Sequence, residues 1–271
     1  MTFRFAVAIS MRNFSPEDFT RKAVSFLQST LTRNNFSKVI IGVSGGVDSA
    51  VSLALCTQAL GARNVLTALL LCGSLNMEGL KNAKKVIGRM QLVPSAIFCR
   101  NIQNIVDEIG KADLAVNMVR KGNIIARVRM MIVFDLAKKH NALVVGTENK
   151  SEQLLGYFTR FGDSASDIEL IRSLYKTEVY MLATYLNVPA EIINAPPTAG
   201  LWEGQTDENE LGFSYGNADH ILYYLYEKKL SIAEVVKKGF EKELIVRLKD
   251  QVERNAFKQS VPYIFHNSAY I

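Results

Sequence analysis

Short apolar runs of strand length alternate with longer amphipathic stretches through the first 150 residues. The apolar runs lie at residues 38–43, 65–71, 95–98 and 143–145, and each is short enough to be a buried strand. Strands that alternate with helices in this way predict a parallel sheet covered on both faces. The expected fold class is therefore an α/β three-layer sandwich with a Rossmann-like parallel sheet.

The segments between these runs have the periodicity of helices. Ser15 and Pro16 are typical of the cap and first position of a helix, which we expect to run to about residue 32. A second helix is predicted from about Ser49 to Leu60, where Gly61 ends it. Further helices are predicted at residues 77–90, 101–120 and 124–139.

The pattern loosens after Gly156. Residues 156–167 and 194–217 are rich in glycine, proline and polar side chains, and we interpret them as lid-like loops that order around a ligand. Residues 218–271 are expected to be mostly helical with a loose tail. Because no internal repeat occurs, we predict one domain spanning residues 1–271.

Composition narrows the class of protein. The sequence has no apolar stretch of 18 residues, which excludes a transmembrane helix, and Met1–Ser10 lacks the features of a signal peptide. We therefore expect a cytoplasmic protein with no membrane partner. Cys56, Cys72 and Cys99 lie in apolar segments without a C-x-x-C pair or a nearby histidine, so buried free thiols are expected instead of a zinc site.

The formal net charge is +6, but lysine and arginine are spread along the chain. No basic stripe interleaved with aromatic residues occurs, as a nucleic-acid surface would require. A polyanionic small substrate accounts for the charge as well as a solvated surface does. We therefore expect small-molecule substrates and no nucleic-acid partner.

A glycine-rich octet directly follows the first predicted strand. It reads Gly42, Val43, Ser44, Gly45, Gly46, Val47, Asp48 and Ser49. Gly45 and Gly46 place no Cβ in the way and can take positive φ, so that backbone N–H groups converge on an anion at the positive end of a helix. The spacing is neither a Walker loop nor G-x-G-x-x-G. Because Asp48 would repel a bound phosphate unless a cation lies between them, the octet predicts Mg²⁺.

A second polar loop, Thr147–Glu152, follows the fourth predicted strand. Ligands of parallel sheets bind beyond the carboxyl ends of the strands, so the two loops face one crevice if their strands are neighbours. Asp48 and Glu152 could then share one Mg²⁺, with phosphate oxygens completing its shell. Lys176 could neutralise the charge of a bound phosphate.

The octet resembles the S-G-G-x-D-S loop of the ATP pyrophosphatase superfamily, whose members split ATP into AMP and pyrophosphate. Gly146–Glu152 and Gly156–Asp163 further resemble the G-T-x-x-x-x-E and G-[YF]-x-T-x-[FY]-G-D segments of NAD synthetases. Residues 127–130, 174–179, 196–199 and 205–212 resemble other segments of that family, so the resemblance covers about residues 38–262. It implies an ammonia-dependent NAD synthetase with the adenine-nucleotide α-hydrolase-like fold.

The resemblance implies roles for individual residues. Residues 42–49, Thr147, Lys176 and Thr198 would bind ATP, while Asp48 and Glu152 would bind Mg²⁺. The groups expected to bind the deamido-NAD⁺ dinucleotide are Arg127, Arg160, Asp167, Phe257 and Lys258. Asp163, with Thr198, would be the place where ammonium docks and loses its proton. The residues implied in catalysis are thus Asp48, Asp163, Lys176 and Thr198.

The implied reaction is ATP-dependent amidation of deamido-NAD⁺ through an acyl adenylate, giving NAD⁺, AMP and pyrophosphate. A chain of 271 residues leaves no room for the glutaminase domain of glutamine-using relatives, so the expected nitrogen source is ammonia, free or from a partner. The resemblance also implies a homodimer with the dinucleotide site near the interface. Four positions depart from the family pattern, namely Leu170 for proline, Arg172 for glycine, Gly200 for aspartate and Phe257 for histidine.

Three alternatives stay open at this point. The chain could be another amidating or thiolating adenylate former, which would release pyrophosphate with xanthosine monophosphate or tRNA. It could be a nucleotide-binding regulator without turnover, which would bind ATP but form no AMP. A basic nucleic-acid-binding module would bind RNA tightly and with strong salt dependence.

Overall fold

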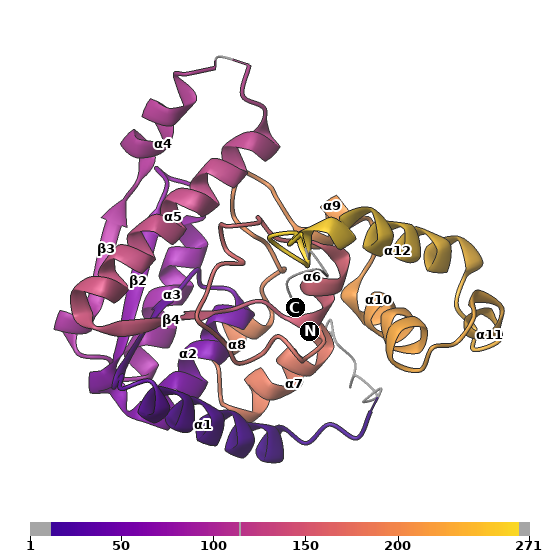
Figure 1. The fold of residues 1–271 in the computed structure, drawn as a ribbon, viewed down its shortest axis with the longest axis horizontal. Coiled ribbons are helices and arrows are strands. Elements are labelled where there is room, and N and C mark those ends of the chain that lie inside the picture. Colours follow the sequence, from indigo (N-terminus) through magenta and orange to yellow (C-terminus); the bar gives the residue numbers. More distant parts are fainter. Residues whose placement is uncertain (1–11, 114, 266–271) are drawn as a thin grey trace.

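The computed structural model describes residues 12–113 and 115–265 (Figure 1). Parallel strands form one five-stranded sheet in the order β3-β2-β1-β4-β5. The strands are β1 Lys38–Gly42, β2 Val65–Leu71, β3 Ile97–Asn101, β4 Ala142–Gly146 and β5 Ile168–Glu169. The predicted parallel sheet is confirmed. The fifth strand was not predicted, because its two residues are too few to form a pattern.

Helices connect and flank the strands. They are α1 Pro16–Arg33, α2 Val47–Leu60, α3 Met77–Arg89, α4 Gln103–Gly110, α5 Met118–His140, α6 Lys150–Leu155, α7 Lys176–Tyr185, α8 Ala190–Ile193, α9 Asp207–Leu211, α10 Tyr215–Leu222, α11 Ile232–Val236 and α12 Lys242–Asn255. A π-helical turn, Tyr223–Glu227, follows α10. Among the described helices, none combines the length and apolarity that crossing a bilayer requires.

The sheet is buried on both faces, which explains why its strands are continuous apolar runs. Val39 and Ile41 pack on one face with α1, α2, α3 and α7. Ile40 points to the opposite face, where it packs with α5. Helices thus cover both faces of the sheet, as the three-layer prediction required (Figure 1).

The C-terminal helices form a second apolar cluster beside the sheet (Figure 1). Ile221 of α10 and Leu248 of α12 are completely buried there, together with Leu155 of α6 and Tyr175 before α7. These helices therefore hold α6 and α7 in place. The prediction of mostly helical structure after residue 217 is confirmed up to residue 265, while the predicted tail and Met1–Ser10 fall largely or wholly outside the described residues.

The predicted helix over residues 101–120 is wrong. Helix α4 ends at Gly110, and α5 begins at Met118 after Asn117. The Asn117 side chain accepts a hydrogen bond from the Arg120 N–H at 2.9 Å and so starts a new helix. The predicted loop over residues 194–217 is only partly correct, since it contains α9 and the start of α10.

Two local expectations also need correction. Helix α2 begins at Val47, not near Ser49, so Asp48 lies in the first helical turn. A carboxylate there is favoured by the positive end of the helix. Cys56 and Cys72 are buried free thiols as expected, but Cys99 on β3 is exposed because β3 lies at the edge of the sheet.

Gly45 has the conformation that the octet predicted, with φ of +87°. A Cβ at this position would lie 1.9 Å from the carbonyl oxygen of Gly79, in the first turn of α3. Glycine is therefore required at position 45 for two reasons. Its backbone is left-handed, and the Gly79 carbonyl leaves no space for a Cβ. The contact fixes the octet against α3.

We predict that Gly45→Ala lowers the free energy of unfolding by about 3 kcal/mol or more, because backbone strain and a steric collision add. Gly61→Ala is a matched control, since Gly61 has φ of +74° but no heavy atom within 4 Å of the added Cβ. The control should lose only the strain contribution of about 1–3 kcal/mol. Urea denaturation measures both, and equal losses would contradict the role of Gly79.

Candidate active site

The octet forms a closed turn between β1 and α2. The Ser44 and Ser49 hydroxyl oxygens lie 3.2 Å apart, and the Gly46 N–H donates to Ser44 Oγ at 3.3 Å. Ser49 Oγ donates to the Gly46 carbonyl at 3.0 Å. These bonds shape the loop so that the first-turn N–H groups of α2 lie at the carboxyl edge of the sheet, where an anion can bind.

Lys176 joins the two predicted acids. Strand β4 pairs directly with β1, so the loops after the two strands are neighbours, as predicted. The Lys176 Nζ donates to Asp48 Oδ2 at 2.6 Å and to Glu152 Oε1 at 2.9 Å. The lysine side chain is only 2 % exposed. Asn149 Nδ2 donates to the other Asp48 oxygen at 2.9 Å, so this carboxylate is held from two sides.

A third acid, Asp207, completes a negatively charged cluster. Its carboxylate is buried and accepts hydrogen bonds from the Tyr157 and Tyr215 hydroxyls, each at 3.2 Å. Burial, Asp48 and Asp207 raise the pKa of Glu152 to about 8, although Lys176 opposes the shift. Burial disfavours the charge of Lys176, but Asp48 and Glu152 outweigh it and hold its pKa well above the usual value. A further cation bound beside Asp48 and Glu152 would favour the charged form of Glu152, which the neighbouring acids disfavour.

The acid pair can supply part of a metal site. Within residues 12–113 and 115–265, no three His, Cys, Asp or Glu side chains form a ready-made metal site. Asp48 and Glu152 nevertheless converge on a single cationic group. Since Mg²⁺ keeps several waters and binds through one or two carboxylates plus phosphates, two acids suffice when a nucleotide is bound.

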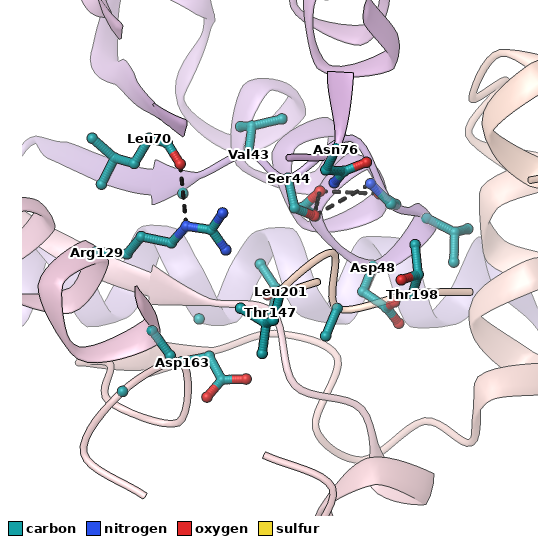
Figure 2. Close-up of a pocket in the computed structure, with 18 of the residues that line it drawn as sticks. Val43, Ser44, Asp48, Leu70, Asn76, Arg129, Thr147, Asp163, Thr198 and Leu201 are labelled. Carbon is teal, nitrogen blue, oxygen red and sulfur yellow. Dashed lines mark hydrogen bonds between the residues drawn. The ribbon is translucent and has the colours of Figure 1, made fainter. Parts of the chain in front are cut away.

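A cavity of about 270 Å³ opens beside this cluster. Figure 2 shows Ser44, Asp48, Thr147, Asp163 and Thr198 arranged around it. The predicted residues that line it are Gly42, Val43, Ser44, Gly46, Val47, Asp48, Ser49, Thr147, Glu152, Asp163, Lys176 and Thr198. The structure therefore brings the predicted ATP, metal and ammonium residues into one space.

Asp163 lies where this cavity meets a second one of about 150 Å³. The Thr159 N–H donates to Asp163 Oδ1 at 2.7 Å. The Asp163 side chain is exposed where the cavities meet. The protein around it raises its pKa by desolvation, while the bond from Thr159 and the charges of Arg129 and Lys258 oppose the shift. The second oxygen of this carboxylate can accept a hydrogen bond from a small cationic donor.

Most of the predicted dinucleotide residues lie together. Arg127 Nη2 donates to the Arg160 carbonyl at 3.3 Å, and the Arg160 guanidinium lies 5.5 Å from the ring centre of Phe257. Lys258 lines the second cavity, and its Nζ donates to the Gly156 carbonyl at 2.7 Å. This arrangement places cationic and aromatic groups next to the second cavity.

Asp167 has a different setting. Its Oδ2 accepts a hydrogen bond from the Val144 N–H at 2.8 Å, and its own N–H donates to the Val144 carbonyl at 2.9 Å. The side chain thus ties the start of β5 to β4. Its predicted contact with the dinucleotide stays a prediction.

Sequence reasoning overlooked several residues of the site. Asn149 and Asp207 both belong to segments that carry the family resemblance, so the motif signal was present for them. Arg129 is a further overlooked residue of the site. Its Nε donates to the Leu70 carbonyl at 3.1 Å, and the rest of its guanidinium faces the cavity (Figure 2). Tyr157 contacts both Asp207 and Glu210, a pairing that local sequence does not reveal.

Comparison with known proteins gives one consistent result. The family model described as NAD synthase matches residues 19–262. A relative from Fusobacterium nucleatum, named NH(3)-dependent NAD(+) synthetase, is 41 % identical over 241 residues, which are 89 % of this chain and 92 % of the relative.

Two solved structures are similar over nearly the whole chain. The structure of NMN synthetase from Francisella tularensis has a TM-score of 0.82 and 31 % identity, covering 94 % of this chain and 100 % of the other. The NH3-dependent NAD synthetase from Campylobacter jejuni has a TM-score of 0.79 and 33 % identity, covering 93 % and 100 %. Both agree with the predicted fold class.

Glu148 lies behind the cavity wall in an unusual environment. Its side chain is buried, and neither carboxylate oxygen has a hydrogen-bond partner within the described residues. The Arg172 Nη2 approaches one oxygen at 3.7 Å. Burial raises the pKa of Glu148 to about 8, and the nearby charges of Asp163 and Glu169 add to the shift.

This shift predicts a pH dependence of stability. The folded chain keeps the Glu148 proton up to about pH 8, whereas an ordinary glutamate loses it near 4.5. The stability that Glu148 contributes below pH 4.5 is therefore lost as pH rises through this window. Between pH 5 and 8, Glu148→Gln should lose less free energy of unfolding than the natural chain, by on the order of 3 kcal/mol. Urea denaturation at several pH values measures this, with Glu17→Gln as an exposed control, and identical pH slopes would contradict it.

Proposed function

The chain belongs to the NAD synthase family, and from that membership we propose that it is an ammonia-dependent NAD synthetase. It amidates deamido-NAD⁺ with ammonia at the expense of ATP, giving NAD⁺, AMP and pyrophosphate. The observation that carries the proposal is the Lys176 ammonium between Asp48 and Glu152, beside a glycine-rich anion-binding loop. Ammonia as the nitrogen source is supported by the similarity of nearly the whole chain to a relative named NH(3)-dependent NAD(+) synthetase.

The first step forms an acyl adenylate. An oxygen of the nicotinate carboxylate attacks the α-phosphorus of ATP, and the bond from that phosphorus to the departing pyrophosphate oxygen breaks. The amides at the start of α2 and the Lys176 ammonium stabilise the charge on the leaving pyrophosphate. Asp48 and Glu152 would hold Mg²⁺, which when bound neutralises triphosphate charge.

The second step transfers nitrogen. Ammonium loses a proton to Asp163, whose raised pKa suits a proton acceptor. Ammonia attacks the acyl carbon, the carbon–oxygen bond to AMP breaks, and the nitrogen releases its second proton to solvent to give the neutral amide. Thr198 Oγ1 donates to the Gln205 carbonyl at 2.7 Å and accepts from the Gly200 N–H at 3.1 Å, so that it shapes the lid over this position. No protein nucleophile is required, and catalysis rests on positioning and charge stabilisation.

The substrate could also be a mononucleotide, because the Francisella tularensis neighbour is an NMN synthetase with the larger of the two TM-scores. The cluster formed by Arg127, Arg160 and Lys258 offers cationic groups beyond the first cavity. Such groups suit the second half of a dinucleotide. We therefore favour deamido-NAD⁺ as the substrate. The assay below also measures turnover of the mononucleotide.

We predict that the purified chain releases pyrophosphate and AMP with ATP, Mg²⁺ and deamido-NAD⁺, and that it forms NAD⁺ only when ammonium is added. The assay compares deamido-NAD⁺, nicotinate mononucleotide, xanthosine monophosphate and tRNA, and then ammonium against glutamine. Turnover with the mononucleotide alone would overturn the dinucleotide assignment. Turnover with glutamine alone would overturn the nitrogen source.

The same assay tests the site. Asp48→Asn should lower kcat/KM by about 100-fold or more, because it weakens the charge arrangement around the triphosphate. Asp18→Asn is a control, since Asp18 lies on α1 with its side chain 45 % exposed. An Asp48 variant with normal kinetics would contradict the proposed ATP site.

We further propose a cytoplasmic homodimer built from single-domain chains. One side of α5 supports it, because Ile124, Arg127 and Met131 follow helical spacing there. Met131 is 51 % exposed, and Ile124 is partly exposed. A second copy packed there would bring the dinucleotide residue Arg127 to the interface.

We predict that Met131→Glu shifts the chain from dimer to monomer, because it places a charge in the apolar centre of this face. Sedimentation velocity over a range of concentrations measures the change. Phe26→Glu on α1 is the control, since Phe26 is 48 % exposed. A natural chain that stays monomeric at all concentrations would contradict the proposal.

A further inference from the structure

Asp219 is a buried carboxylate that contacts two elements of the active site. It lies on α10 and is completely inaccessible to solvent. Its Oδ1 accepts a hydrogen bond from the Ser151 hydroxyl at 2.5 Å, and its Oδ2 accepts one from the Thr177 N–H at 2.8 Å. Ser151 precedes Glu152 in α6, and Thr177 follows Lys176 in α7.

Further bonds join the same two helices. The Lys176 N–H donates to Ser151 Oγ at 2.9 Å, so this hydroxyl links the backbone of the lysine to Asp219. The Lys150 N–H donates to the Leu174 carbonyl at 2.7 Å. The result is a continuous network from α10 through α6 to the first turn of α7. Glu152 and Lys176 lie at its two ends.

The charge of Asp219 suits this place. The first N–H groups of a helix have no partner within the helix, and a carboxylate satisfies them while it interacts favourably with the helix dipole. Burial raises the pKa of Asp219 to about 6, and the bonds from Ser151 and Thr177 oppose the shift. A buried charge contributes little net stability compared with a well-packed apolar side chain. Its bonds to Ser151 and to the Thr177 N–H fix α6 relative to the start of α7.

We propose that Asp219 is a positioning residue of the active site, which fixes the spacing of Glu152 and Lys176 through Ser151 and the start of α7. The expected effect of Asp219 on turnover rests on the proposed function. Its effect on nucleotide binding can be measured without turnover. The C-terminal helical cluster thus acts on the proposed ATP site through α6 and α7.

The test uses Asp219→Asn and Ser151→Ala in the full chain, singly and together. Each single variant should lower kcat for pyrophosphate release by about 10- to 100-fold, because small displacements of reacting groups have effects of this size. Each should also weaken ATP binding in the presence of Mg²⁺, measured by calorimetry. Since both act through one network, the double variant should lose no more than the worse single variant. Ser151→Ala removes a single oxygen and keeps the test valid if Asp219→Asn does not fold.

Glu178→Gln is the matched control. Glu178 is a buried acid at the same end of α7, but its Oε2 accepts from the Tyr175 N–H at 2.9 Å and its carboxylate pairs with Arg12 instead of the α6 network. It should lower the melting temperature while kcat and nucleotide affinity stay within about twofold. A control that loses as much activity as Asp219→Asn, or losses that multiply in the double variant, would overturn the inference. A natural chain that binds ATP but forms no NAD⁺ would overturn the proposed function and leave the calorimetric test standing.

Discussion

The Lys176 ammonium between Asp48 and Glu152 is the interaction on which the site depends. The three residues come from segments far apart in the chain, and each is delivered by a different structural feature. Asp48 follows β1, Glu152 follows the neighbouring strand β4, and Lys176 begins α7. Removing one partner of such a group leaves the others buried and unpaired, at a cost of several kcal/mol. The sheet order, the glycine turn and the C-terminal helices all serve to hold these charges together.

The same charges connect the site to its lid. Asp207 lies close enough to Lys176 to influence its charge, and its N–H donates to the Pro197 carbonyl at 2.9 Å. Tyr157 contacts both Asp207 and Glu210, and Gln205 Nε2 donates to Glu210 at 3.0 Å. The segment before α9 is therefore fixed by Asp207, which lines the first cavity, and by Glu210, which lines the second. The charge of Asp207 thus links Lys176 to the segment over residues 197–207.

Features that depend on local sequence pattern could be predicted from the sequence. Features that depend on contacts between distant residues could not. Buried parallel strands and the octet could be predicted because apolar runs and glycine spacing are local signals. The break between α4 and α5 was missed because one cap residue, Asn117, decides it within an amphipathic stretch. Lys176 was expected to contact phosphate, but its bonds to both acids follow from the packing of α7. Asp219 gave no signal at all, since its partners lie more than 40 residues away.

Two of the departures from the family pattern, Gly200 and Arg172, lie beside polar residues that contact them. A Cβ at Gly200 would lie 2.6 Å from Asn76 Nδ2, and Asn76 also accepts from the Gly79 N–H at 3.0 Å. The polar side chain in this part of the cavity is thus supplied by the cap of α3, which leaves no room for an aspartate on the lid. Arg172 in turn gives the buried Glu148 its cationic neighbour. Gly200 and Arg172 thus each pack beside a polar residue of the site region, while Lys176 keeps its bonds to Asp48 and Glu152.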